Sequence, residues 1–269
     1  MSADLGALGP IVERKRREVA EINCGRAAIW ATAEHLPPAP GFEVLRGGRV
    51  IAELKRRSPS GGSLRAGLDV GAVGAAYAGA GAAAMSVLTD GPDFGGSPAD
   101  LQAVRTAVAI PVLRKDFTVD PVQVAESRVL GADWVLLIVA VLEGGALEEC
   151  LEAARRAGAQ AVVEVHDEPQ VERALAVGAT CVGINNRDLR SLRTDLDTFS
   201  RLRRLLPDRV VSVAESGVRN SSDAARLVGE GADAVLVGEA LMRHPDPGAL
   251  CAELVAAAAR AGSARRDIR

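Results

Sequence analysis

The sequence has few of the residues that tie a chain to metals, disulfides or membranes. Its four cysteines lie far apart and form no C-x-x-C pair, so we expect neither a disulfide framework nor a zinc site, and the chain suits a reducing compartment, the cytoplasm. The three histidines are too scattered to suggest a metal cluster. The longest apolar run, residues 134–142, is far shorter than the roughly 20 residues that cross a bilayer. We therefore expect a cytoplasmic protein with no membrane contact and no bound metal.

A large net charge and the common cofactor motifs are also missing. The net charge is −3 and the isoelectric point about 5.8, which argues against a protein that coats nucleic acid. There is no G-x-x-x-x-G-K-[ST] loop and no G-x-G-x-x-G fingerprint, so we expect neither a nucleoside triphosphate nor a dinucleotide cofactor. The sequence predicts no cofactor and no nucleic-acid partner.

Lysine is unusually scarce. Among the 32 lysine and arginine residues, only Lys15, Lys55 and Lys115 are lysines. Arginine stays charged, whereas a buried lysine amine can release and accept a proton, so a retained lysine can mark a position that arginine does not fill. Lys15 lies in a charged helical stretch, residues 14–17, which we interpret as a solvated helix face. Lys55 and Lys115 follow apolar runs and are candidates for proton transfer.

A simple unit repeats along the chain. Short, almost wholly apolar runs alternate with amphipathic helical stretches, and such runs are typical of parallel strands that are covered on both faces. The candidate strands are residues 50–54, 84–88, 110–113, 134–138, 161–165, 181–184, 210–213 and 234–237. Helix starts are indicated by candidate N-cap residues: Asp69, Ser97, Asp120, Asp167, Asp195, Ser221 and Asp246.

Eight strand candidates, each followed by a helix, define the fold class. Strict alternation over this length predicts an α/β protein with a single closed (β/α)8 TIM barrel, and an open doubly wound sheet is the alternative. Residues 1–46 are expected to form an N-terminal helical extension, with a helix around residues 8–22 that caps one end of the barrel. Residues 47–259 would form the barrel, and residues 260–269 a frayed basic tail.

Chemistry-bearing residues gather where the strands end, which is where barrel enzymes have their active sites. Glu53 and Glu164 are embedded in apolar runs, and burying an unpaired carboxylate is costly, so each needs a partner. Barrel closure would bring a set of acids and amines around one mouth, where they could divide general acid from general base work. This set is Glu53, Lys55, Lys115, Glu164, Asn185 and Glu215. His166 also lies near a strand end, but we expect it to pack or cap.

Two turns suggest a phosphate site. Ser216 and Gly217 follow the seventh strand and Gly238 follows the eighth, where barrels commonly bind phosphate on backbone N–H groups. Ser58 and the glycines after it add a hydroxyl and allow close backbone approach. Glycines alone are a weak signal, because they also end strands for ordinary turn reasons.

Taken together and in order, these motifs resemble the indole-3-glycerol phosphate synthase family of tryptophan biosynthesis. The matching segments are residues 51–60, 86–90, 111–117, 163–168, 183–189, 214–217 and 236–239. The resemblance implies a metal-free ring closure of 1-(2-carboxyphenylamino)-1-deoxyribulose 5-phosphate, with loss of carbon dioxide and water. By position, Lys115 matches a general acid and Glu164 the general base of the dehydration. Lys55 matches a lysine that holds the anionic substrate and is a second candidate acid.

The resemblance also implies the remaining site residues. Glu53 and Asn185 match orienting residues, and Glu215 and Ser216 complete the catalytic set. Phosphate contacts match Ser58, Gly217 and Gly238, and the apolar wall around the aromatic ring matches Phe94, Phe117, Leu136 and Leu236, with Arg187 nearby. The chain departs from the family at Gly61, where a lysine is common.

Two other functions stay open on the sequence. One is another barrel enzyme acting on a phosphorylated sugar, such as the isomerase of the neighbouring pathway step, because it would share the phosphate site. The other is a non-catalytic paralogue that binds a phosphate ester. We expect a small phosphorylated substrate as partner and a monomer as the oligomeric state. A weak dimer, or contact with another tryptophan-pathway enzyme, is the alternative.

Overall fold

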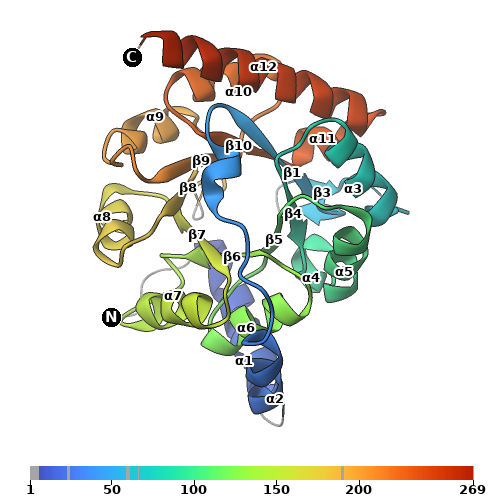
Figure 1. The fold of residues 1–269 in the computed structure, drawn as a ribbon, viewed down its shortest axis with the longest axis vertical. Coiled ribbons are helices and arrows are strands. Elements are labelled where there is room, and N and C mark those ends of the chain that lie inside the picture. Colours follow the sequence, from blue (N-terminus) through green and yellow to red (C-terminus); the bar gives the residue numbers. More distant parts are fainter. Residues whose placement is uncertain (1–5, 23–24, 59–60, 66, 189–190, 269) are drawn as a thin grey trace.

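The chain folds into a closed barrel of eight parallel strands, in the order β1-β10-β9-β8-β7-β6-β5-β4 (Figure 1). The computed structural model describes residues 6–22, 25–58, 61–65, 67–188 and 191–268. Hydrogen bonds between β1 and β4 close the barrel, which confirms the TIM-barrel prediction and makes the open-sheet alternative wrong. The barrel strands are β1 (Arg49–Leu54), β4 (Ala84–Leu88), β5 (Val112–Lys115), β6 (Trp134–Ile138), β7 (Gln160–Val165), β8 (Cys181–Asn185), β9 (Val211–Glu215) and β10 (Ala234–Val237).

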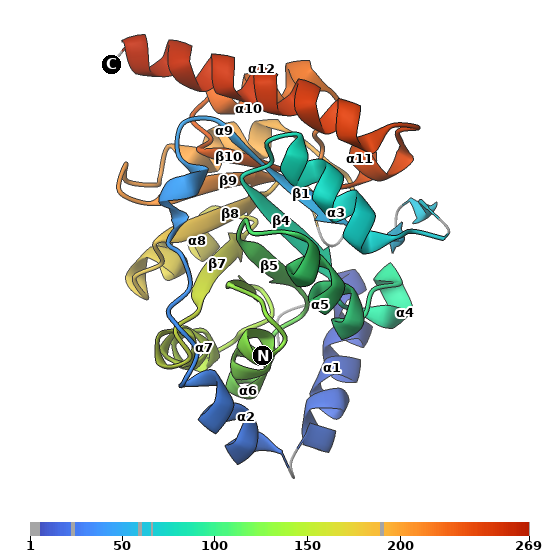
Figure 2. The same ribbon diagram turned by 45° about the vertical axis from the view of Figure 1, so that its right-hand side comes forward.

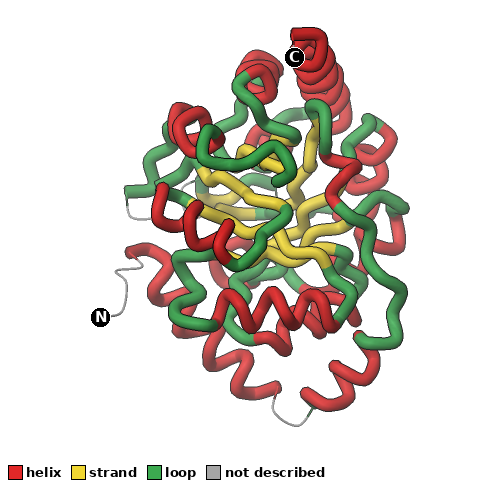
Figure 3. Tube along the Cα trace, turned by 60° about the vertical axis from the view of Figure 1, so that its left-hand side comes forward, coloured by secondary structure: helices red, strands yellow, loops and turns green. Residues whose placement is uncertain are grey.

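Helices surround the strands on the outside, as the tube drawing shows (Figure 3). They are α1 (Gly9–Glu21), α2 (Arg26–Ala33), α3 (Val70–Gly79), α4 (Gly91–Phe94), α5 (Pro98–Ala107), α6 (Pro121–Val129), α7 (Ala146–Arg156), α8 (Glu168–Ala176), α9 (Asp197–Arg203), α10 (Ser221–Gly229), α11 (Glu239–Arg243) and α12 (Pro247–Ile268). Short 3-10 turns form η1 (Gly6–Leu8) and η3 (Phe42–Leu45). A small antiparallel pair, β2 (Arg57–Ser58) and β3 (Gly62–Ser63), which the apolar pattern did not indicate, follows β1.

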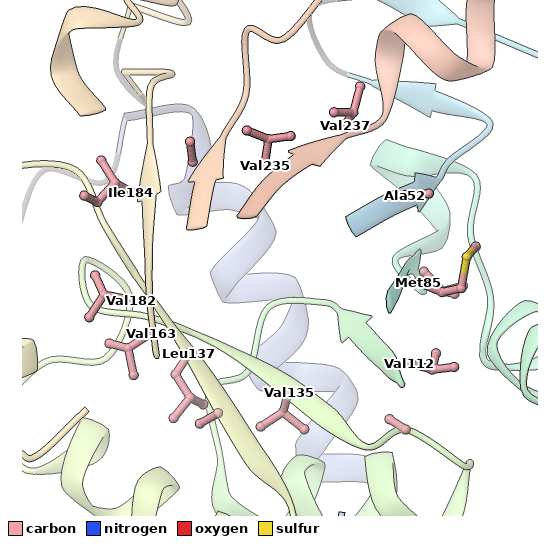
Figure 4. Close-up of a cluster of buried hydrophobic side chains, with 14 of the residues drawn as sticks. Ala52, Met85, Val112, Val135, Leu137, Val163, Val182, Ile184, Val235 and Val237 are labelled. Atoms are coloured by element: carbon pink, nitrogen blue, oxygen red, sulfur yellow. The ribbon is translucent and has the colours of Figure 1, made fainter. Parts of the chain in front are cut away.

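The barrel strands are mostly apolar because both of their faces are buried. Successive side chains of a strand point to opposite faces. On β1, Ala52 belongs to the cluster between strands and helices, whereas Ile51 belongs to the cluster inside the barrel. Figure 4 shows the outer cluster, in which Met85, Val135 and Val163 from different strands face the helix layer. The same alternation decides which polar residues enter the barrel.

Helix starts follow the predicted caps with two exceptions. Asp69, Ser97, Asp120 and Asp167 each accept a backbone N–H of the first helical turn, and Asp120 forms a capping box with Gln123. Asp246 also accepts an N–H group from the start of α12. The first exception is the start of α9, where the cap position is Leu196, so the assignment of Asp195 was wrong by one residue; Asp195 accepts the N–H of Asp197 from just outside the helix. The second exception is the start of α10. There the cap is Asn220, whose side chain accepts the N–H of Asp223, so the assignment of Ser221 was wrong by one residue.

The N-terminal segment contacts both ends of the barrel. Leu8 and Ile11, which flank the start of α1, reach the cavity at the carboxyl ends of the strands. Phe42 of η3 packs on Trp134 at the first residue of β6, with ring centroids 4.8 Å apart, at the opposite end. Figure 2 shows α1 beside α4 and α5, on the side where the strands end. We expected the extension to cap one end of the barrel, and it contacts both ends.

The basic C-terminal segment is helical. Residues 260–268 continue α12, so the expectation of a frayed tail there was wrong. Arg265 donates from Nη1 to the carbonyl oxygens of Val228 and Ala232, at 3.1 and 3.0 Å. A cation near the carbonyl end of α10 is favourable to the helix dipole. The arginines that suggested a solvated tail thus help to fix α12 against α10.

Candidate active site

A cavity of about 870 Å³ opens at the carboxyl ends of the strands. Every barrel strand contributes at least one side chain to its wall, and Leu8 and Ile11 add an edge from the N-terminal segment. All of the site residues predicted from the sequence line this cavity: Glu53, Lys55, Ser58, Phe94, Lys115, Phe117, Leu136, Glu164, Asn185, Arg187, Glu215, Ser216, Gly217, Leu236 and Gly238. The structure therefore brings the whole predicted set together, and the role of each residue stays a prediction.

Strand alternation explains why the charged residues face inward. Leu113 of β5 and Val162 of β7 pack inside the barrel, so Lys115 and Glu164, two residues further along, share that face. Val213 places Glu215 in the same way on β9. Each of these three residues lies at or next to the end of its strand, just above the apolar interior. Because the strands are parallel, the three residues lie at the same height along the barrel axis, and their long side chains meet there.

Lys115 is the centre of the ion cluster. Its Nζ lies 2.8 Å from Oε2 of Glu164 and also pairs with Oε2 of Glu215. Asn185 donates from Nδ2 to the other oxygen of Glu164, at 3.1 Å. The backbone N–H of Arg187 donates to Oδ1 of Asn185, which fixes the amide with its NH₂ group toward Glu164. Glu164 and Glu215 thus fix the Lys115 ammonium, and Lys115 and Asn185 fix the two oxygens of Glu164.

Burial and neighbouring charges shift the pKa values of Lys115, Glu164 and Glu215 in different directions. Burial would lower the pKa of Lys115, but Glu164, Glu215 and Glu53 outweigh it and raise that pKa. Burial would raise the pKa of Glu164, but Lys115 and His166 lower it well below its ordinary value. Burial and the negative charge of Glu164 raise the pKa of Glu215, and Lys115 lowers it. Burial is the largest of these effects, so the pKa rises to about 7. Near neutral pH the site therefore holds a charged amine, a charged carboxylate and a carboxyl that is partly protonated.

Glu53 and Lys55 form a second pair on β1 and just beyond it. Nζ of Lys55 lies 2.6 Å from Oε1 of Glu53, and Oγ of Ser86 donates to Oε2 of Glu53 at 3.4 Å. A side chain at position 238 would overlap the Glu53 carboxylate, so Gly238 gives that carboxylate its room. Glu53 thereby orients one of the two amines of the site.

The polar end of the cavity lies at the turns after β1, β9 and β10. Ser216 and Gly217 both take left-handed backbone angles, with φ of 62° and 89°. A non-glycine residue pays of order 1 kcal/mol or more for this conformation, and the Asn186 amide, which donates to the Ser216 carbonyl at 3.1 Å, holds it. Side chains beyond the predicted set add positive charge here, because Arg219 and Arg243 also line the cavity.

Arg243 occupies the space beside Gly61. Its Nη2 donates to the carbonyl oxygen of Gly61 at 2.8 Å, and its Nε donates to Oε1 of Glu239 at 3.0 Å. A Cβ on Gly61 would lie 2.9 Å from Nη2 of Arg243 and 2.7 Å from Oγ of Ser58. The loop after β1 thus carries no side chain at position 61, and a guanidinium from α11 fills that place.

The opposite end of the cavity is apolar. Phe94 and Phe117 lie with ring centroids 6.1 Å apart, and Leu136, Leu236 and Ile138 complete a wall that suits an aromatic ring. Leu8 and Ile11, which the motifs did not indicate, cover this end from the N-terminal segment. A ligand with an aromatic group at one end and an anion at the other matches the two ends of the cavity.

The scan against family models decides which family these features belong to. The model described as "Indole-3-glycerol phosphate synthase" matches residues 9–254. The chain belongs to the indole-3-glycerol phosphate synthase family.

Curated relatives support the same family over nearly the whole chain. The indole-3-glycerol phosphate synthase of Parafrankia sp. is 50% identical over 258 residues, which is 94% of this chain and 96% of the relative. That of Nocardioides sp. is 53% identical over 222 residues, 82% of this chain and 85% of the relative. Indole-3-glycerol phosphate synthase 1 of Streptomyces coelicolor is 50% identical over 259 residues, 94% and 96% of the two chains.

Among solved structures, the thiamine phosphate pyrophosphorylase of Pyrococcus furiosus resembles the fold of this family member. Its TM-score is 0.60 at 17% identity, over 81% of this chain and 99% of that chain. At this identity the likeness concerns the barrel fold alone.

The part of the chain that the structure describes shows neither a metal site nor a membrane span. No group of three or more His, Cys, Asp or Glu side chains there is arranged to hold a metal ion. None of the helices there is long and apolar enough to cross a membrane.

Proposed function

We propose that the cavity is the active site of an indole-3-glycerol phosphate synthase. The chain is a carboxy-lyase of tryptophan biosynthesis, and its substrate is 1-(2-carboxyphenylamino)-1-deoxyribulose 5-phosphate. The products are indole-3-glycerol phosphate, carbon dioxide and water. The observation that carries this assignment to the cavity is the contact of Lys115 with Glu164 and Glu215, between an aromatic-lined end and an anion-compatible end.

Lys115 is the proposed acid for ring closure. An aryl carbon is a poor nucleophile, so the carbonyl that it attacks needs a proton donor placed nearby. The raised pKa keeps Lys115 charged and able to donate. The pKa of Glu215 is about 7, and its protonation removes one of the two carboxylates that pair with Lys115. Lys115 can then release its proton at a lower free-energy cost. Lys55 lies across the site as the second amine, held by Glu53.

Glu164 is the proposed base for the dehydration. Its lowered pKa keeps it ionised at neutral pH, which is the state that accepts a proton. Asn185 and Lys115 fix its two oxygens, so the carboxylate is oriented before the substrate arrives. Loss of carbon dioxide, which precedes this step, restores the aromatic ring and needs no further group.

The two ends of the cavity position the substrate. Ser58, Ser216, Gly217 and Gly238 are the proposed phosphate contacts, and Arg243 adds a charge near them. Phe94, Phe117, Leu136 and Leu236 are the proposed wall for the aromatic ring, with Arg187 at its edge. A phosphate bound far from the reacting carbons supplies binding energy that can be used to orient them.

We also propose that the chain acts as a monomer in the cytoplasm. Among the described residues, the large hydrophobic side chains with high exposure are Val44, Val129 and Leu205, each from a different segment of the chain. Cys150, Cys181 and Cys251 are buried free thiols, as suits a reducing compartment. Light scattering on the purified chain tests the monomer, with a dimer or a complex with another pathway enzyme as the contrary results.

The test of function is a turnover assay with the purified chain and the proposed substrate, read by the absorbance and fluorescence of the indole product. We expect stoichiometric release of carbon dioxide. Calorimetry with a reduced, non-reactive substrate analogue runs beside it. Binding of the analogue without turnover would favour a non-catalytic phosphate-ester binder. Conversion of the substrate of the preceding isomerase step, without indole formation, would favour the isomerase.

A further inference from the structure

The turn after β9 has a backbone conformation that its residue type does not favour. Ser216 has a φ of 62°, in the left-handed region that few non-glycine residues occupy. Such a residue keeps this conformation only where its surroundings stabilise it. Because Ser216 and Gly217 form part of the cavity wall, whatever stabilises their backbone also shapes the site.

Asn186, the residue after β8, stabilises this turn. Its backbone N–H donates to the Glu215 carbonyl at 2.9 Å, and its Nδ2 donates to the Ser216 carbonyl at 3.1 Å. One residue thus binds two successive carbonyls of the neighbouring chain segment. Asn186 is 2% exposed, and strand alternation places it on the same face as Ile184, which packs toward the helix layer. It therefore lies behind the cavity wall.

The start of α9 fixes the orientation of the Asn186 amide. Oδ1 of Asn186 accepts the backbone N–H of Phe199, in the first turn of that helix, at 2.9 Å. A backbone N–H only donates and a backbone carbonyl only accepts, so the oxygen and the NH₂ group of the amide cannot exchange places. The NH₂ group is thereby directed to Ser216.

The peptide unit between Ser216 and Gly217 converts this contact into a direction. The Ser216 carbonyl and the Gly217 N–H belong to one planar trans peptide and point in opposite directions. The carbonyl points to Asn186, behind the wall, so the N–H points toward the cavity that Gly217 lines. Among the described residues this N–H meets no hydrogen-bond acceptor. An N–H with a fixed direction and no partner in the chain suits an anion.

The segment before α9 also contacts this turn. A Cβ on Gly217 would lie 2.7 Å from Cγ2 of Thr194 and 2.7 Å from Cδ2 of Leu196. The turn is therefore packed on one side by this segment and hydrogen-bonded on the other by Asn186, whose own amide is bound by α9. The wall at Gly217 is built by contacts between β8, β9 and α9.

We propose that Asn186 is a positioning residue that sets the affinity of the site for the substrate phosphate, because it fixes the Gly217 N–H toward the cavity. This inference rests on the proposed function, in which Gly217 is a phosphate contact. Without the Asn186 amide, Ser216 relaxes to a negative φ and the N–H turns away. The apparent dissociation constant then rises by the inverse of the fraction of molecules that keep the binding conformation.

Titration with inorganic phosphate, read by ³¹P NMR, tests this without turnover. We expect Asn186→Ala to raise the Kd for phosphate about 5- to 10-fold, because an unsupported serine occupies the left-handed region only in a minor fraction of molecules. Glycine takes positive and negative φ about equally. In a Ser216→Gly background the same change at Asn186 should therefore raise the Kd only about twofold. In the turnover assay of the Asn186→Ala single variant, KM should rise and kcat should stay within about twofold.

Asn220→Ala is the matched control. Asn220 is exposed in the loop after β9, and like Asn186 it accepts an N–H from the first turn of a helix, that of Asp223 at 3.0 Å. Its side chain bonds α10 instead of Ser216, so phosphate should bind this variant as it binds the wild type. Asn186→Ser is a milder second variant, because its hydroxyl is too short to join Phe199 to Ser216. We expect a smaller loss in the same direction, and thermal melts show that each variant folds.

Three results would overturn this role of Asn186. The first is a phosphate Kd within twofold of the wild-type value in folded Asn186→Ala or Asn186→Ser. The second is an equal loss in the Ser216→Gly background, since Asn186 would then not act through the Ser216 backbone. The third is a kcat that falls as much as KM rises, which a general distortion gives. A wild type that binds phosphate but forms no indole product contradicts the proposed function instead, and the phosphate titrations still decide the role of Asn186.

Discussion

Nζ of Lys15 lies 3.0 Å from Oδ1 of Asp116, so an ion pair ties α1 to the residue that follows Lys115. The same Nζ lies 3.2 Å from Oδ1 of Asp90 and 2.9 Å from Oε2 of Glu18. Lys15 is 6% exposed, so the interpretation of residues 14–17 as a solvated face was wrong for it. Asp90 caps the short helix that carries Phe94, and Asp116 precedes Phe117. One ammonium therefore joins α1 to both aromatic walls of the cavity.

We expect Lys15→Met to lower the free energy of unfolding by roughly 2 kcal/mol, because removing one partner leaves buried carboxylates less well paired. The loss stays below that of an isolated buried pair, since Arg14 still contacts Asp90 and Arg114 still contacts Asp116. Chemical denaturation measures it. Arg16→Met, at an exposed position of the same helix, is the control and should change stability little. Equal stability of the two variants would contradict a structural role for Lys15.

The sequence indicated the barrel and the polar residues at its mouth but not the ion pairs of Lys15, for a physical reason. An apolar run buried on both faces makes a strand visible, and a carboxylate inside such a run, like Glu53 or Glu164, is visible as an exception. Lys15 has charged neighbours on every side in the sequence, which is also what a solvated helix looks like. Its partners Asp90 and Asp116 come from loops that only the closed barrel brings beside α1.

Arg243 was missed for a similar reason. It is the last residue of the short helix α11 after β10, and nothing in its local pattern points to the loop after β1. Only closure of the barrel, with β1 beside β10, brings its guanidinium to the Gly61 carbonyl. Residues that act through contacts between distant segments leave little local signal.

Glu215 makes the free energy of unfolding depend on pH, and the sign of this dependence follows from its raised pKa. Its folded pKa of about 7 lies above the ordinary value of 4.5, so between these values the folded state keeps a proton that the unfolded state has released. The free energy of unfolding therefore falls as pH rises through this window, by up to roughly 3 kcal/mol in total. Glu164, with a lowered pKa, acts below 4.5, and His166 acts above 6.5, so the clean window is pH 4.5 to 6.5.

Denaturation curves of the wild type and Glu215→Gln measure this effect. The glutamine keeps the shape of the side chain and cannot titrate, so we expect the stability of the wild type to fall relative to the variant as pH rises from 4.5 to 6.5. Parallel curves across that window would show that Glu215 has an ordinary pKa in the folded chain. The ¹³C shift of the Glu215 carboxyl group gives an independent reading.

Arg243→Gln should weaken the binding of the phosphorylated substrate. A charge-assisted hydrogen bond to phosphate contributes about 1.5–3 kcal/mol, so we expect KM to rise about 10-fold or more with kcat within about twofold. Arg155→Gln, at an exposed ion pair on α7, is the matched control and should behave as the wild type. With a dephosphorylated substrate, the wild type and Arg243→Gln should be equally poor. A tenfold difference that persists without the phosphate would place Arg243 in another role.

Lys115→Arg tests the proposed acid most directly. Arginine keeps the positive charge beside Glu164 and Glu215 but does not release a proton at working pH. We therefore expect turnover to fall at least ~100-fold, the usual contribution of a positioned general acid, while the reduced analogue still binds. Steady-state assays measure the fall and calorimetry measures the binding. Lys55→Arg is the informative comparison, because Lys55 pairs with Glu53 alone among the cavity carboxylates. If Lys115→Arg turns over at nearly the wild-type rate while Lys55→Arg does not, the acid is Lys55 and the ion cluster around Lys115 serves only to orient Glu164.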